Sequence, residues 1–128
     1  MYNFFAYLSR MKYVNRWSLM RNSDTENIQE HSHMVAVLAH ALAVIRRDVL
    51  GRPCDPSACA AAALFHDATE IFTGDLPTPI KYYSPEIREA YRQVEDTAAE
   101  RLLSMLPPEM VPAYAPLVHE AEGEVREI

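Results

Sequence analysis

The sequence predicts an all-α protein, a single helical bundle of five to six helices. Apolar residues recur at the three- and four-residue spacing of helices along most of the chain, and strand-like alternation is nearly absent. Capping residues and prolines stand where these periodic stretches begin and end. With 128 residues, 49% hydrophobic and only three glycines, the chain has the size of one domain with one core. We therefore expect residues 1–128 to form a single domain.

The first two helices are predicted from caps and apolar spacing. Asn3 is a candidate cap for a helix of about three turns, and the segment NRWSLMRNSDTEN (15–27) predicts a loop after it. Asn27 and Glu30 have the spacing of a capping box, so a second helix should begin there and reach about Leu50. We expect its core-facing side to carry Met34, Val35, Leu38, Leu42 and Ile45.

A third predicted helix, PSACAAAALFHDATEIF (56–72), is apolar nearly all round and should be the central, buried one. Asp55 caps it, Pro56 opens it and Gly74 ends it. A fourth helix should begin at Ser84 and Pro85 and end before two consecutive prolines. Its expected core-facing stripe contains Ile87, Tyr91, Val94, Ala98, Leu102 and Met105.

The tail, EMVPAYAPLVHEAEGEVREI (109–128), predicts short helical pieces broken by Pro112 and Pro116.

Composition excludes several classes of protein. Twelve basic residues against 18 acidic ones give a net charge of −6, which argues against a partner that is a nucleic-acid polymer. No apolar run reaches the ~20 residues of a membrane span, and the N-terminus has no signal-peptide pattern. Cys54 and Cys59 lack a metal-ligand spacing and are expected to be free thiols in a reducing compartment. These features predict a cytoplasmic protein that binds no membrane.

The dipeptide His66–Asp67 places an imidazole and a carboxylate on the helix expected to be buried. An ionised carboxylate is costly to bury alone, so Asp67 needs a partner, either an arginine or a metal ion shared with the histidine. His31 lies on the expected core face of its helix, whereas His33 and His40 face away. A lone histidine there is more often a hydrogen-bonded core residue, but three inward-pointing groups favour a shared ion.

Two further carboxylates lie close to this dipeptide in the sequence. Glu70 follows His66 by four residues, so both would share one helical face; otherwise Glu70 is a surface residue near the helix end, where the dipole disfavours negative charge. Asp75 follows Gly74 and is either an ordinary loop residue or a second carboxylate at the mouth of the same site.

Three segments carry a family resemblance that extends from about residue 4 to 120: FFAYLSRMKYVNRWSLMRN, TENIQEHS and HDATEIFTGDLPTPIKY. His31 and His66–Asp67 resemble the HD-domain phosphohydrolase superfamily, whose metal ligands follow the order H…HD…D. Within it, the NRW, EHS and HDxxExxTGDLPTPxK patterns closely resemble those of the bacterial 5'-deoxynucleotidases.

The resemblance implies hydrolysis of deoxyribonucleoside 5'-monophosphates to deoxynucleoside and phosphate by a homodimer with a divalent metal, Co²⁺, Mn²⁺ or Mg²⁺. His31, His66 and Asp67 would then bind the metal. Glu70 would orient or deprotonate the attacking water, and Asp75 would lie near the scissile ester oxygen.

The resemblance also implies substrate contacts. Arg16 would bind the phosphate, since a guanidinium suits its bidentate geometry, and Trp17 would pack on the sugar and exclude a ribose 2'-hydroxyl. Without the family resemblance, Arg16 could equally be a solvated loop cation, and Trp17 a core residue beneath the loop. Thr78 and Lys81 are weaker substrate-binding candidates, because their position at a helix entry explains them equally well.

One ligand of the family pattern has no match in the sequence. The final metal-ligand aspartate is expected a few residues past Ile128, and Asp96 should face water instead. We therefore expect a chain truncated before the family's last helices, with metal binding and activity reduced accordingly. Two alternative functions stay open: another HD-type phosphodiesterase or nucleotide hydrolase, and a non-enzymatic, metal-stapled helical module for dimerisation or regulation.

Overall fold

The computed structural model describes residues 2–16, 25–74, 78–81 and 83–119, and within these ranges the protein is helical and has no strand. The predicted all-α class is confirmed. The elements in chain order are α1 (Phe4–Leu8), η1 (Ser9–Tyr13), α2 (Ile28–Val44), the π-helical turn η2 (Ile45–Val49), α3 (Pro56–Phe65), α4 (Glu70–Thr73), α5 (Thr78–Lys81), α6 (Pro85–Leu103), η3 (Pro108–Met110) and α7 (Val111–Val118).

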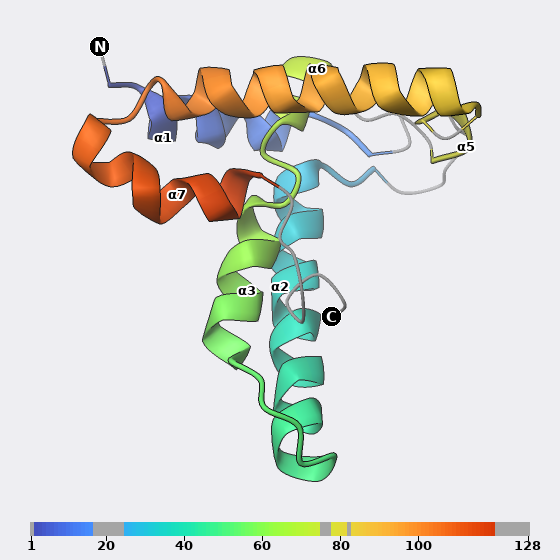
Figure 1. Cartoon of the computed structure of the whole chain (residues 1–128), viewed down its shortest axis with the longest axis vertical. Coiled ribbons are helices and arrows are strands. Elements are labelled where there is room, and N and C mark those ends of the chain that lie inside the picture. Colours follow the sequence, from blue (N-terminus) through green and yellow to red (C-terminus); the bar gives the residue numbers. More distant parts are fainter. Residues whose placement is uncertain (1, 17–24, 75–77, 82, 120–128) are drawn as a thin grey trace.

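Helices α2 and α3 form an antiparallel pair, and α6 runs across one end of this pair with α1 and α7 beside it (Figure 1). The predicted capping box starts α2: the Asn27 side chain accepts a hydrogen bond from the Glu30 backbone N–H at 2.9 Å and donates one to the Glu30 carboxylate at 2.8 Å. Asn3, by contrast, makes no side-chain capping bond to α1.

The face that α2 buries differs from the predicted one. Small side chains fill the interface with α3, namely Ala36, Ala39, Ala43, Cys59 and Ala63. Because α3 is itself rich in alanine, the two helices fit through their small residues. The large side chains Met34, Leu38, Leu42 and Ile45 are instead 47–55% exposed. We call these four residues the apolar face of α2.

The predicted start of α6 is confirmed, because Ser84 accepts a hydrogen bond from the Ile87 backbone N–H and Pro85 opens the helix. Its core stripe is correct only in the second half. Ala98 and Leu102 are buried, but Ile87 and Val94 are 42% and 51% exposed. The reason is that the first half of α6 extends beyond the neighbouring helices that cover its second half (Figure 1).

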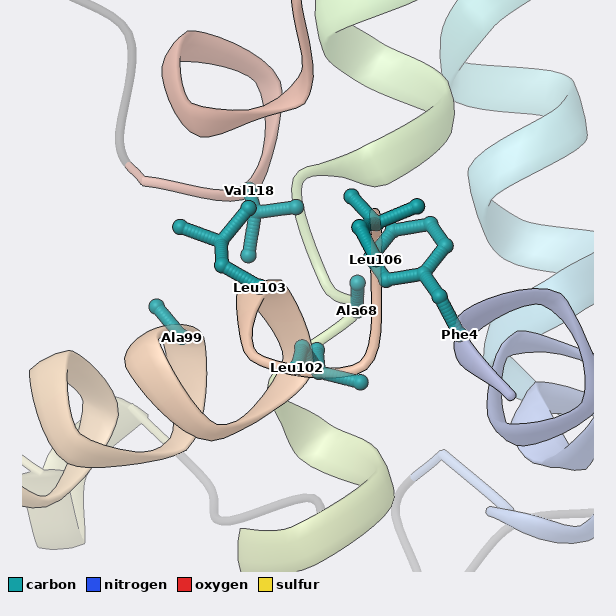
Figure 2. Close-up of a cluster of buried hydrophobic side chains, with 7 residues drawn as sticks. All are labelled: Phe4, Ala68, Ala99, Leu102, Leu103, Leu106 and Val118. Carbon is teal, nitrogen blue, oxygen red and sulfur yellow. The ribbon is translucent and has the colours of Figure 1, made fainter. Parts of the chain in front are cut away.

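One hydrophobic cluster joins the ends of the bundle (Figure 2). It contains Phe4, Ala68, Ala99, Leu102, Leu103, Leu106 and Val118, which come from α1, the turn after α3, α6 and its C-terminal flank, and α7. Ala68 is fully buried in it. The residue directly after His66–Asp67 is therefore fixed in the core.

The third predicted helix is not continuous. Asp55 caps α3 as expected, accepting hydrogen bonds from the Ser57 and Ala58 backbone N–H groups, but the helix ends at Phe65. Residues 66–69 form turns, and α4 begins at Glu70. Gly74 ends α4 with φ of 74°, a left-handed conformation that glycine adopts without a Cβ clash. The dipeptide thus lies at a helix break rather than within a helix.

Helix α7 continues through Pro116, where the sequence predicted a break. A proline within a helix removes one backbone hydrogen bond, and in this short, packed helix that loss is tolerated. Among the described residues, no helix combines the length and apolarity needed to cross a membrane.

Candidate metal centre

The antiparallel pairing of α2 and α3 brings His31 to the His66–Asp67 dipeptide. His31 lies in the first turn of α2, and the dipeptide follows the last residue of α3. In an antiparallel pair, the start of one helix lies beside the end of the other (Figure 1). The three side chains therefore meet at the same end of the pair. His33 and His40 are exposed, as predicted.

One carboxylate oxygen lies at the centre of the group. Asp67 Oδ2 is 3.0 Å from His66 Nε2 and 3.7 Å from His31 Nε2. One potential ligand atom from each of the three residues lies within 4.8 Å of those of the other two. The side chains are 20% exposed for Asp67, 21% for His31 and 37% for His66, so the group is sheltered but reachable from solvent.

A backbone contact fixes the tautomer of His66. Its Nδ1 atom is within hydrogen-bonding distance of the Ala63 carbonyl oxygen, which can only accept. Nδ1 therefore carries the proton, and in the neutral ring Nε2 directs its lone pair toward Asp67. This is the arrangement of a metal-binding histidine oriented by a backbone carbonyl.

The donor set fits a divalent cation. Two imidazole nitrogens and a carboxylate oxygen suit Zn²⁺ and neighbouring first-row metals, and carboxylates also bind Mn²⁺ and Mg²⁺. Ligand atoms that each lie about 2.1 Å from a metal are about 3.0 to 3.4 Å apart. The two contacts of Asp67, 3.0 and 3.7 Å, lie near this range, and all three ligand atoms lie within 4.8 Å of one another, so an ion can be enclosed when the side chains move closer together.

The surroundings shift the pKa values of the two histidines in opposite directions. Burial lowers the pKa of His31, and the positive charge of Arg16 lowers it further. Burial also acts to lower the pKa of His66, but the hydrogen bond to Asp67 and the charge of Asp67 outweigh it, so this pKa is raised. The Asp67 carboxylate thus favours a positive charge on His66, whereas burial and Arg16 disfavour one on His31.

Glu70 is buried next to this group, with 6% of its surface exposed. Its backbone N–H donates to the Asp67 carbonyl at 3.0 Å, and its negative charge contributes to the raised pKa of His66. The interpretation as a surface residue at the end of a long helix is therefore wrong, because Glu70 is the first residue of α4.

Arg16 comes close to the same group. Its positive charge lowers the pKa of His31, and its Nη1 atom forms an ion pair with Glu26 Oε2 at 2.8 Å. The Arg16 side chain is 23% exposed, so it is not the fully solvated loop cation of the alternative interpretation. The sequence did not predict two groups that orient site residues: Glu26, which pairs with Arg16, and the Ala63 carbonyl, which contacts His66. No local motif indicates either contact.

The other predicted site residues lie at the limits of the described structure. Trp17 and Asp75 lie outside the described residues. Thr78 and Lys81 are the first and last residues of the short helix α5, and only their backbone is described.

A cleft of about 1220 Å³ opens beside the metal-ligand candidates. Parts of α2, α3, α6 and α7 line it, and His66 and Asp67 form part of its wall. A small molecule in solution can therefore approach the dipeptide.

One histidine at the start of α2 and a histidine–aspartate dipeptide after the end of α3, converging within a helical bundle, define the class of HD-domain proteins. A family model described as 5'-deoxynucleotidase YfbR-like matches residues 3–128. The chain belongs to this family.

Known relatives agree with this membership. A 5'-deoxynucleotidase of Erwinia tasmaniensis is 51% identical over 118 residues, which cover 92% of this chain and 60% of the relative. One from Vibrio parahaemolyticus is 46% identical over 128 residues, covering 96% of this chain and 66% of the relative. The chain thus spans about 60% of the length of the curated relatives it matches.

Solved structures show the same fold. An HD-domain phosphohydrolase of Listeria innocua matches with a TM-score of 0.84 and 26% identity, covering 98% of this chain and 60% of that protein. An HD phosphohydrolase of cyanophage S-2L, solved with dA and one catalytic Zn²⁺ ion, matches with a TM-score of 0.59 and 28% identity over 86% of this chain and 64% of that protein.

Proposed function

We propose that the chain forms one HD domain, residues 1–128, of a metal-dependent 5'-deoxynucleotidase that converts deoxyribonucleoside 5'-monophosphates to deoxynucleoside and phosphate. The observation that carries this proposal is the convergence of His31, His66 and Asp67 within 4.8 Å. Family membership and the relatives named 5'-deoxynucleotidase support the choice of reaction.

The three converging residues are proposed to hold the metal, with Co²⁺, Mn²⁺ or Mg²⁺ as the working ion. The catalytic zinc ion of the cyanophage phosphohydrolase, which has the same fold, supports a divalent cation as the bound metal. A divalent cation bound there lowers the pKa of water and offsets negative charge on phosphoryl oxygens.

Glu70 is proposed to accept a proton from the attacking water. Its burial beside His66 supports this role, since a sheltered carboxylate is a better base than a fully hydrated one. Asp75 is proposed to lie near the ester oxygen of the leaving nucleoside, as in the family pattern.

Arg16 is proposed to bind the substrate phosphate, and its charge near His31 supports this assignment. Trp17 is proposed to pack on the sugar and to exclude a 2'-hydroxyl, with Thr78 and Lys81 as further substrate contacts. Replacing Trp17 with Ala should raise activity toward AMP relative to dAMP, and an unchanged ratio would remove Trp17 from this role.

Phosphate release tests the proposed reaction. Purified protein is freed of metal with a chelator, reloaded with Co²⁺, Mn²⁺, Mg²⁺ or Zn²⁺, and supplied with dAMP or AMP. We expect metal-dependent phosphate release that is faster from dAMP. A protein that binds metal but releases phosphate from neither nucleotide would support the metal-stapled helical module instead.

We also propose that the protein is a homodimer and acts in the cytoplasm. The apolar face of α2 supports self-association, because contiguous exposed apolar side chains favour a protein interface, and the two free thiols support a reducing compartment. Light scattering should give a dimer mass for the wild type and a monomer mass for Leu38→Glu/Leu42→Glu. His40→Glu, on an exposed part of the same helix, is the control. A monomer mass for the wild type would contradict the proposed homodimer.

A further inference from the structure

We propose that Glu26 is a positioning residue for Arg16: its carboxylate holds the guanidinium in the orientation that receives a phosphate group. The inference rests on the proposed function, which gives Arg16 its role in phosphate binding. It assigns a role to a residue of the TENIQEHS segment for which the sequence indicated none.

The side-chain contact is direct. Glu26 Oε2 accepts a hydrogen bond from Arg16 Nη1 at 2.8 Å, a short, charge-assisted contact. The two side chains are 23% and 38% exposed, so the pair is partly sheltered from water. A contact of this kind selects one orientation from the many that a flexible arginine side chain can adopt.

The backbone holds both residues in register. The Arg16 N–H donates to the Glu26 carbonyl at 2.7 Å, the Ile28 N–H donates to the Val14 carbonyl at 2.8 Å, and Asn15 and Asn27 form an antiparallel bridge. The ion pair therefore joins two short segments that are already fixed side by side. The backbone pairing, and not the ion pair with the Arg16 side chain, fixes the position of Glu26.

This paired region lies at the start of α2, which carries His31. Asn27 caps the helix, and His31 follows it by four residues, about 6 Å along a helix axis. Arg16 is tied to this start of α2 by its backbone hydrogen bond to the Glu26 carbonyl and by the bridge between Asn15 and Asn27. The backbone pairing therefore keeps Arg16 beside the end of α2 that carries His31.

Glu26 has two opposite effects on phosphate binding. Its negative charge repels the phosphate, whereas its hydrogen bond orients the Arg16 guanidinium that binds the phosphate. If orientation dominates, removing the carboxylate weakens phosphate binding; if repulsion dominates, removing it strengthens binding. Orientation should dominate, because the repulsion acts across the intervening guanidinium and is screened by solvent at this exposure.

Two substitutions separate these effects. Glu26→Gln removes the charge but keeps a carbonyl oxygen that can accept from Arg16, whereas Glu26→Ala removes both. The readout is the affinity for inorganic phosphate, measured by calorimetry in the presence of Mg²⁺. We expect Glu26→Ala to weaken binding about tenfold and Glu26→Gln by about threefold or less. The KM for dAMP should rise in parallel, with a smaller change in kcat.

The Arg16→Ala background tests whether Glu26 acts through Arg16. Adding Glu26→Ala to Arg16→Ala should cause no further loss of phosphate affinity. Asp48→Asn is the matched control, because it removes a carboxylate from the exposed Arg47–Asp48 ion pair, whose two residues do not line the cleft, and it should leave affinity unchanged. Thermal melting and metal content are measured for every variant.

Phosphate affinity that is unchanged or tighter in Glu26→Ala would overturn the proposal, as would an equal further loss in the Arg16→Ala background. If Glu26→Ala fails to fold, Glu26→Gln carries the test, and a loss of tenfold or more there would overturn positioning by the hydrogen bond. Failure of the proposed function gives a different result: wild-type protein that binds phosphate but releases none from dAMP.

Discussion

His31 approaches Asp67 from a different helix, and its Nε2 atom lies 3.7 Å from Oδ2 of the aspartate. The contact exists because α2 and α3 are antiparallel and both residues lie at the same end of the pair. Asp67 also lies 3.0 Å from Nε2 of His66, whose other ring nitrogen faces the Ala63 carbonyl. Three groups with the chemistry of metal ligands are thus oriented toward one point.

Replacing Glu70 with Gln should lower kcat for dAMP by about 10²- to 10⁴-fold, the usual contribution of a general base. The amide keeps the shape of the buried side chain but cannot take up the proton. Metal content should stay at the wild-type level, since Glu70 is not among the three converging ligand candidates. A kcat equal to that of wild type would exclude Glu70 as the base.

The position of the hydrophobic core can be tested on α6. Leu102 is completely buried, so Leu102→Ala should lower the free energy of unfolding by about 2–5 kcal/mol. Val94 is 51% exposed on the same helix, and Val94→Ala should change it by less than about 0.5 kcal/mol. Urea denaturation measures both variants. Comparable losses would mean that the whole predicted stripe is buried after all.

The cap of α3 should contribute measurably to stability. Asp55 accepts hydrogen bonds from two backbone N–H groups, so Asp55→Ala should reduce the free energy of unfolding by about 1 kcal/mol. Asp48→Ala serves as the control, because Asp48 pairs only with its exposed neighbour Arg47 and should be neutral. The cap assignment fails if the two variants melt at the same temperature.

The two cysteines should differ in reactivity with pH. Burial raises the pKa of Cys59 to about 11, with a smaller contribution from the contact to Cys54 Sγ at 3.8 Å. At pH 8 only about one Cys59 thiol in a thousand is the reactive thiolate, and that fraction rises tenfold per pH unit toward pH 11.

Mass spectrometry after treatment with iodoacetamide at pH 8 should therefore find Cys54, which is half-buried, labelled first. Protein unfolded in guanidinium is the control, in which both thiols should react. Equal labelling of the two cysteines in folded protein would contradict the burial of Cys59.

Local signals predicted where three of the helices begin. Asn27, Asp55 and Ser84 cap their helices as expected, since a cap depends on backbone groups two or three residues away. The buried faces were less predictable. On α2 the choice between large side chains and alanines depends on α3, which no window of neighbouring residues includes.

The candidate site was also predicted only in part from the sequence. The cost of burying a carboxylate indicated that His66 and Asp67 need a partner, and helical spacing selected His31 over His33. The helix break after Phe65 was missed, because the segment is apolar and periodic on both sides of it. The pairing of Glu26 with Arg16 depends on two polar segments meeting, for which the sequence has no periodic signal.

Anomalous X-ray scattering from crystals loaded with Co²⁺ tests the central claim most directly. We expect one strong peak between His31 Nε2, His66 Nε2 and Asp67 Oδ2, and its loss in Asp67→Ala protein that melts like wild type. A fully loaded crystal with no peak among these three atoms, or a peak that persists without Asp67, would contradict the assignment of the metal centre.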